Sequence, residues 1–187
     1  ILFSKSADAG VTWSTPQRIN KIAGDCVDSD NTVEGAIPMV GANGEIYVVW
    51  QSAAGLVFNK SLDDGVTWMN QETLICTVPG GWDYNITGLQ RANGLPQALV
   101  DLSGGPNHGT IYVNWTDQRN GSTDTDVFLV KSTDGGQTWT SPLRVNNDPA
   151  GKQQFLTWMS IDQTNGNIYC VFYDRRNYSV STQQTDV

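Results

Sequence analysis

Short apolar stretches rich in β-branched and aromatic residues recur along the chain, and polar segments separate them. Three stretches share one pattern, Glu45–Trp50, Thr110–Trp115 and Asn167–Phe172, and a turn signal containing Gly or Asn precedes each. Stretches of this length and composition, bounded by turn residues, are typical of β-strands. Further apolar runs lie at 36–40, 56–58, 95–102, 127–130 and 155–161. The pattern therefore predicts a chain built from short strands and turns.

One eight-residue motif, Ser-x-Asp-x-Gly-x-Thr-Trp, occurs three times, each time directly after an apolar run. The Asp side chain can accept hydrogen bonds from nearby backbone amides and so close a turn. Gly supplies a positive φ, and Thr and Trp favour the start of another strand. We therefore expect the motif to stabilise the fold rather than to bind a ligand. Its fixed residues are Ser6, Asp8, Gly10, Thr12 and Trp13; Ser61, Asp63, Gly65, Thr67 and Trp68; and Ser132, Asp134, Gly136, Thr138 and Trp139.

The repeating unit contains four strands in the order inner, second, third, motif turn and outer. Four-stranded antiparallel sheets that repeat in phase are typical of a β-propeller, whereas a jelly roll or sandwich does not explain a turn repeated in phase. We predict an all-β fold with about three blade-equivalents in one domain, 1–187. The expected parts are a half blade at 1–20, blades at 36–78 and 95–146, and a half blade at 155–187.

Closed propellers use about four to eight blades. Three blade-equivalents do not close comfortably, so we expect the remaining blades to come from the rest of its own propeller or from a second copy. The first of these alternatives is preferred.

The repeated motif resembles the Asp-box, or bacterial neuraminidase repeat, of the sialidase-like β-propeller superfamily. The resemblance implies a larger, six-bladed propeller in which the box lies between the third and fourth strands, away from the substrate face. Sialidases bind the substrate carboxylate with three arginines, and they use an Asp as general acid and a Tyr nucleophile paired with a Glu. Their first arginine lies in an Arg-Ile-Pro segment. The nearest segment here is Ala36-Ile37-Pro38, which lacks the arginine.

Charge and composition exclude several classes of function. The net charge of −8 disfavours binding to a phosphate backbone, so we expect no nucleic-acid partner. No apolar run approaches the roughly 20 residues of a membrane span. The three cysteines follow no zinc spacing and His108 is the only histidine, so we expect no zinc site and no His-based triad. Cys26 and Cys76 could form a disulfide, because spacing alone does not fix connectivity.

We expect neither a cofactor nor a metal, with one alternative left open. The segment Asp25–Glu34 is rich in oxygen ligands and could hold Ca²⁺. It lacks the spacing of an EF-hand loop, which favours a solvated acidic loop.

Binding residues are expected in two sets of loops that share one face of such a propeller, from outer to next inner strand and from second to third strand. Two loops of the second set resemble each other, 116–120 and 173–177, and each contains Asp and Arg. A guanidinium there could bind a carboxylate or sugar hydroxyls, although an Asp–Arg pair that orders the loop is the favoured interpretation. The candidates are Asp117 and Arg119 in one loop and Asp174, Arg175, Arg176 and Tyr178 in the other.

A second candidate surface lies in the loop that contains Trp82, Asp83 and Tyr84. Two aromatic rings beside a carboxylate could stack on a sugar, or the loop could pack on its own Trp. The two interpretations are equally favoured.

These observations predict an extracellular or cell-surface protein that engages a glycan or polysaccharide. In an enzymatic form, similar to a sialidase-like glycoside hydrolase, Arg175 or Arg176 would clamp an acidic sugar, with Asp174 or Tyr178 near the reacting carbon. The alternative is a non-catalytic adhesive or structural interaction scaffold that uses the same face.

Overall fold

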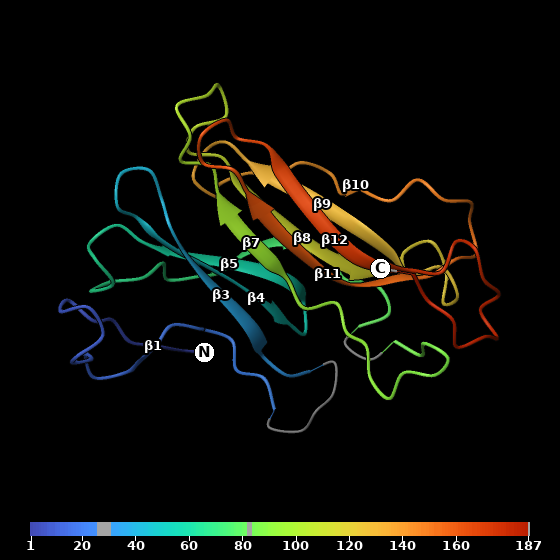
Figure 1. Ribbon diagram of the computed structural model, residues 1–187. Coiled ribbons are helices and arrows are strands. Elements are labelled where there is room, and N and C mark those ends of the chain that lie inside the picture. The colour runs from blue at the N-terminus through green and yellow to red at the C-terminus, as the bar shows by residue number, and fades with distance from the viewer. Residues whose placement is uncertain (26–30, 82–83, 187) are drawn as a thin grey trace.

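The computed structural model describes residues 1–25, 31–81 and 84–186, which form twelve β-strands in four antiparallel sheets (Figure 1). The all-β propeller architecture expected from the sequence is confirmed. One complete sheet contains β3 (Glu34–Val40), β4 (Ile46–Ser52), β5 (Gly55–Ser61) and β6 (Thr73–Cys76). The other contains β7 (Gln97–Val100), β8 (Ile111–Asp117), β9 (Asp126–Ser132) and β10 (Leu143–Arg144). The two-stranded sheets contain β1 (Leu2–Phe3) with β2 (Gln17–Arg18), and β11 (Gln154–Ile161) with β12 (Ile168–Asp174).

The pairing register shows which strands of the two-stranded sheets correspond to those of a complete blade. Leu2 pairs with Arg18 as Phe128 pairs with Arg144, so β1 and β2 are equivalent to a third and an outer strand. Ile161 pairs with Ile168 in the way that inner and second strands pair in the complete sheets. The two small sheets are therefore opposite halves of the same unit.

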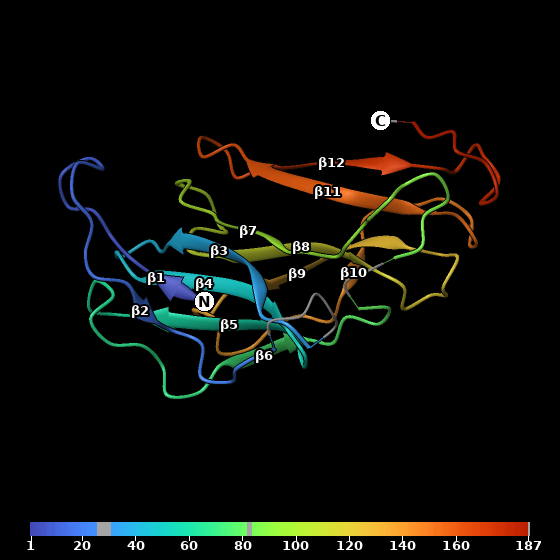
Figure 2. The same cartoon turned by 90° about the horizontal axis from the view of Figure 1, so that it is seen from below.

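The sheets stack face to face, as Figure 2 shows from below. One core lies between the two complete sheets, where Val49 and Phe58 belong to the same buried cluster as Ile111 and Val113. Burial of aliphatic and aromatic side chains is the main force that holds such layers together. A second core joins β1–β2 to the other face of the β3–β6 sheet.

The outer face of β11–β12 contains large apolar side chains that remain exposed. Trp158 is 63% exposed, Tyr169 55% and Val171 64%. Trp158 lies directly opposite Val171, and Ser160 opposite Tyr169, so these side chains share one face. In Figure 2 this sheet is the outermost layer. On the other face, Cys170 lies opposite the buried Met159 and is half-buried.

The three copies of the motif form one recurring turn, which we call the Ser-x-Asp turn. In the third copy, Ser132 Oγ donates to Asp134 Oδ1 (2.8 Å), and the Thr138 amide donates to the same oxygen (2.9 Å). Thr138 Oγ1 donates to Asp134 Oδ2, and the Gly136 amide donates to Ser132 Oγ. The other two copies repeat these four bonds.

Hydrogen bonds from the Thr side chain, the Thr backbone and the Ser hydroxyl lower the pKa of each of the three turn aspartates to about 2. The carboxylates are therefore charged acceptors that hold the turn closed, as a structural role requires.

None of the described segments forms a helix with the length and apolar character needed to cross a membrane.

Candidate functional site

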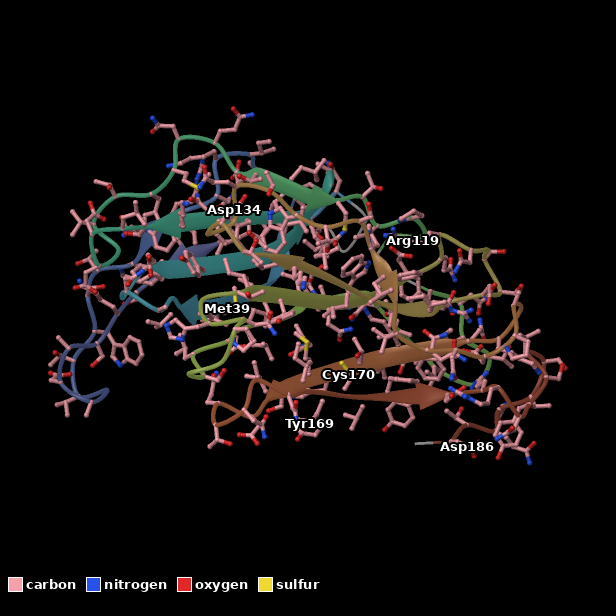
Figure 3. All side chains as sticks on the ribbon, turned by 90° about the horizontal axis from the view of Figure 1, so that it is seen from above. Met39, Arg119, Asp134, Tyr169, Cys170 and Asp186 are labelled. Carbon is pink, nitrogen blue, oxygen red and sulfur yellow. The ribbon has the colours of Figure 1, made fainter. Side chains whose placement is uncertain are left out.

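The loops expected to bind ligand lie together at one end of the sheets, which we call the loop face. It comprises 52–55, 77–81, 84–96, 117–126, 145–153 and 174–186. Figure 3 places Arg119 and Asp186 toward this end and Asp134 toward the other. The Ser-x-Asp turns therefore lie away from the loop face.

Asp117 and Arg119 form a closed pair within the first candidate loop. Asp117 Oδ1 accepts from the Arg119 amide (3.1 Å) and from Arg119 Nε (2.9 Å). The guanidinium also lies 4.5 Å from the centre of the Phe128 ring, and its Nη2 donates to the Thr77 carbonyl. Burial alone would lower the pKa of Arg119, but the hydrogen bond and charge of Asp117 outweigh it and raise the pKa. Arg119 is therefore a fixed cation that ties this loop to the neighbouring 77–81 segment.

Asp174 and Arg176 repeat this arrangement in the second loop. Asp174 Oδ1 accepts from the Arg176 amide (2.8 Å), and Oδ2 accepts from Arg176 Nε. Arg176 Nη1 also donates to Asn147 Oδ1 (3.1 Å). Burial raises the pKa of Asp174, but hydrogen bonds from Gln154 and Arg176 outweigh this effect and leave the pKa below its usual value. Asp174 is therefore a carboxylate at neutral pH.

The same hydrogen bond, from an Asn side chain to an Asp carboxylate, follows each of the two Asp–Arg pairs, one in each blade. Asn120 Nδ2 donates to Asp126 Oδ2 (2.6 Å), and Asn177 Nδ2 donates to Asp186 Oδ2 (2.9 Å). The Asp174 and Asp186 backbones exchange two 2.9 Å hydrogen bonds, so Asp186 occupies the position that Asp126 has opposite Asp117. The repeated Asp-x-Arg-Asn segment thus builds the same turn twice.

Arg175 lies inside the loop face rather than on it. The side chain is 1% exposed. It donates to the Thr87 carbonyl (2.7 Å), the Thr182 carbonyl (3.1 Å) and Thr185 Oγ1 (3.0 Å), and it stacks over the Phe155 ring. These contacts join two loops that are far apart in sequence. A buried guanidinium with these bonds fits a structural role and is poorly placed to clamp a substrate.

Tyr178 lies beside Asp186 at the edge of the second loop. Its hydroxyl donates to Asp186 Oδ1 (2.8 Å). This hydrogen bond and the charge of Asp186 raise the pKa of Tyr178. A phenol with a raised pKa is a weaker nucleophile at neutral pH than an ordinary tyrosine.

Tyr84 is buried, with 2% of its surface exposed, and its hydroxyl donates to the Thr116 carbonyl. It packs with Ile86, Ala92 and Phe155 in a small core. This ring supports the loop from inside instead of offering a surface for stacking. Trp82 and Asp83 lie outside the described residues.

A cavity of about 390 Å³ opens on the loop face beside the first candidate loop. Its wall includes Gln51, Ser52, Thr77 and Gly80. The Gln51 side chain is buried, and its Oε1 has no hydrogen-bond partner in the described part of the chain. The 77–81 segment of the wall is held in place because the Gln118 backbone N–H donates to the Pro79 carbonyl (2.9 Å).

A buried polar network joins the second complete blade to β11–β12. Asp126 accepts from Arg144 Nε (2.6 Å) and Asn146 Nδ2 (2.5 Å). Asn146 also donates to Gln154 Oε1 (2.9 Å), and Gln154 Nε2 donates to Asp174 Oδ1 (2.9 Å). Sequence reasoning missed this network. The signal was present, because Arg-Ile-Asn at 18–20 and Arg-Val-Asn at 144–146 close two nearly identical segments.

Part of the residues named in the disulfide and Ca²⁺ predictions lies outside the described chain. Cys26 lies outside it, and Cys76 is a free, largely buried thiol whose pKa burial raises to about 11. Across residues 1–25, 31–81 and 84–186, no three His, Cys, Asp or Glu side chains gather as a metal site. Asp28 and Asp30 of the acidic segment lie outside these ranges, so the Ca²⁺ hypothesis stays a prediction.

Neither a protein-family model nor a curated protein matches the chain. Among solved structures, it is similar to the α-L-arabinofuranosidase Arb93A from Fusarium graminearum in complex with an iminosugar inhibitor. That match has 17% identity and a TM-score of 0.54, and covers 85% of this chain and 45% of that one. The intramolecular trans-sialidase from Ruminococcus gnavus in complex with oseltamivir carboxylate matches at 19% identity and a TM-score of 0.50, over 99% and 39% of the two chains. NanB with optactamide matches at 13% identity and a TM-score of 0.51, over 92% of this chain and 23% of that one.

The chain spans less than half the length of these three proteins. At this level of identity the similarity shows the fold, a β-propeller of the kind found in glycoside hydrolases, and it leaves the activity open.

Proposed function

We propose that this chain is an Asp-box segment of an extracellular or cell-surface β-propeller, and that its loop face binds a glycan. Three Ser-x-Asp turns with identical hydrogen bonds support the Asp-box assignment. The similar structures are those of a glycosidase and a trans-sialidase, solved with an iminosugar and with oseltamivir carboxylate. Further blades, from the rest of its own propeller or from a second copy, complete the fold.

The observation that carries this proposal is the cavity beside the Asp117–Arg119 pair. Its volume of about 390 Å³ lies within the range of roughly 300–1,000 Å³ that small-ligand sites occupy. Its wall is polar, because Gln51, Ser52 and the exposed Thr77 contribute to it. A sugar presents many hydroxyl donors to such a wall. The cavity therefore fits a short glycan better than an apolar ligand.

The candidate residues favour binding over catalysis. A glycosidase acid needs a raised pKa, whereas the pKa of Asp174 is lowered. Arg119 and Arg176 are paired with carboxylates, and Arg175 is buried among carbonyls. The lowered pKa of Asp174 and the pairing of these arginines support the second candidate function, a non-catalytic scaffold that binds glycan. A sialidase-like hydrolase would require Arg176 to leave Asp174 and clamp an acidic sugar.

A glycan array and two fluorogenic assays on the 1–187 chain test these alternatives together. The assays use an α-sialoside and an α-L-arabinofuranoside. We expect array binding without turnover, and we expect Thr77→Ala, at an exposed residue of the cavity wall, to weaken binding while the opposite-face variant Asn43→Ala leaves it unchanged. Turnover that Arg176→Ala abolishes would support the hydrolase instead. Absence of both binding and turnover would contradict the glycan proposal.

A further inference from the structure

A second cavity, of about 380 Å³, lies at the end of the sheets opposite the loop face, the end that Asp134 marks in Figure 3. It opens between the two complete blades, where the β3–β4 hairpin faces the loop before β8 and the third Ser-x-Asp turn. Four side chains with polar or charged groups contribute to its wall: Lys60, Glu45, Tyr47 and His108. The cavity therefore combines groups of both charges within a volume typical of small-ligand sites.

The third Ser-x-Asp turn has a glycine where the second turn has an aspartate, because Gly135 and Asp64 hold the same position in the motif. In the second turn, Lys5 donates to the Asp64 carbonyl (2.7 Å) and forms an ion pair with the Asp64 carboxylate. Lys60 is the equivalent of Lys5, since each directly precedes the Ser of a motif, and it donates to the Gly135 carbonyl (2.8 Å). Within the residues that the structure describes, Lys60 forms no ion pair. Lys60 thus repeats the backbone contact of Lys5 without the carboxylate.

The glycine at position 135 leaves space in front of Lys60. Asp64 and Gly135 have similar left-handed backbones, with φ of +59° and +69°, so the turn admits a side chain at this position. A Cβ at Gly135 would lie 3.6 Å from both Lys60 Nζ and Tyr47 Oη, and a longer side chain would extend into the cavity beside them. An ammonium group has three donors, and Lys60 uses one of them on the turn. A ligand carboxylate is therefore able to pair with Lys60 as Asp64 pairs with Lys5.

The opposite charge on the cavity wall restricts the ligand further. Burial raises the pKa of Glu45, but hydrogen bonds from the backbone and Asn43 and the charge of Lys60 outweigh this effect and leave the pKa below its usual value. Glu45 is therefore a carboxylate at neutral pH. His108 Nδ1 lies 2.6 Å from the Ser103 carbonyl, which only accepts, so Nδ1 carries the proton and Nε2 of the neutral ring is an acceptor. Glu45 and His108 thus favour an ammonium group and disfavour a ligand that is only anionic.

We propose that this cavity binds a zwitterionic α-amino acid with an apolar side chain. The carboxylate of the ligand pairs with Lys60 and accepts from the Tyr47 hydroxyl, in the space that Gly135 leaves open. Its ammonium group donates to the Glu45 carboxylate and to His108 Nε2. The apolar side chain lies against the aliphatic residues of the same wall, Ala42 and Leu62. The site is separate from the cavity on the loop face, so the proposal does not rest on glycan binding.

Isothermal titration calorimetry on the 1–187 chain at neutral pH tests the two charges of the ligand with three probes. The probes are L-leucine, N-acetyl-L-leucine, which lacks the ammonium group, and L-leucinamide, which lacks the carboxylate. We expect L-leucine to bind and each analogue to bind about tenfold more weakly or less, because each loses one charge-assisted contact. Equal affinity for the three probes, or no binding of L-leucine, would overturn the proposal.

Three variants place the binding at this cavity. Gly135→Asp supplies the carboxylate that Asp64 has in the second turn, so it should pair with Lys60 and abolish L-leucine binding, while urea unfolding shows that the fold is retained. Lys60→Met should weaken binding by about tenfold or more. The matched control is Lys131→Met, because Lys131 is the equivalent lysine of the next blade and does not line the cavity; its affinity should equal that of the unaltered chain. Unchanged L-leucine binding in Gly135→Asp or in Lys60→Met would overturn the proposal, whereas the glycan array is read separately and is unaffected by either result.

Discussion

The Ser-x-Asp turns contain a glycine whose replacement should separate backbone strain from steric overlap. Gly136 has a φ of +82°, and a Cβ built there would lie 2.2 Å from Phe58 Cε1. Gly44, in the β3–β4 hairpin, has a φ of +88° and no atom within 4 Å of such a Cβ. The two sites therefore share the conformational requirement and differ in the surrounding space.

The magnitudes follow from these surroundings. A left-handed conformation costs a non-glycine residue about 1–2 kcal/mol, part of which is offset by reduced entropy of the unfolded chain. Phe58 is fully buried and contacts both Tyr47 and Trp139, so its ring has little room to move. Overpacking a filled core adds about 1–3 kcal/mol. Gly136→Ala should therefore lower the free energy of unfolding by about 2–4 kcal/mol, and Gly44→Ala by about 1 kcal/mol or less.

Urea unfolding followed by tryptophan fluorescence measures both values on one protein background. The comparison requires that the free energy of unfolding falls with urea concentration at the same slope in both variants, and the measured slopes check this. Equal losses at the two glycines would refute the reasoning, because they would show that the turn does not press against Phe58. A smaller loss at Gly136 than at Gly44 would refute it as well.

Three further outcomes are expected. Asp126 is fully buried, and Asp126→Ala removes an acceptor from the buried Asn146, the partly buried Arg144 and the exposed Asn120. The variant should cost about 3–5 kcal/mol in urea unfolding, against less than about 1 kcal/mol for the exposed Asp64→Asn; similar values would contradict the buried network. The pKa of Asp134 is about 2 in the folded protein and about 3.9 in the unfolded chain. Its contribution to stability should therefore be complete above the unfolded pKa and disappear as the pH falls through about 2. NMR titration of the Asp134 carboxyl measures the folded pKa, and a value near 4 would contradict this. The thiol of Cys76, with its pKa raised to about 11, should react with iodoacetamide at pH 8 far more slowly in the folded protein than in urea.

The strands and the turns were predictable because their signals are local. The β-branched stretch from Glu45 to Trp50 became β4, and the repeated Asp and Gly of the motif formed the expected turn. The irregularities were not predictable in this way. The register of β11 shifts between Phe155 and Trp158, where Leu156 adopts a φ of +52°, and nothing in the adjacent sequence indicates it.

The candidate site depended on contacts between distant segments, which one sequence does not reveal. Arg175 follows Asp174 in a polar loop and resembles a surface residue, yet the side chain is buried and donates to the Thr87 carbonyl of a distant loop. Tyr84 likewise donates to the Thr116 carbonyl of another loop. The roles of Asp117 and Arg119 in ligand binding stay a prediction, although their pairing within the loop was among the interpretations that the sequence favoured.

The most direct test of a glycan-binding loop face is a crystal structure of the 1–187 chain soaked with the sugar that binds best on the array. The sugar should occupy the cavity lined by Gln51, Thr77 and Gly80. A sugar bound among the Ser-x-Asp turns at the opposite end, with that cavity empty, would contradict it.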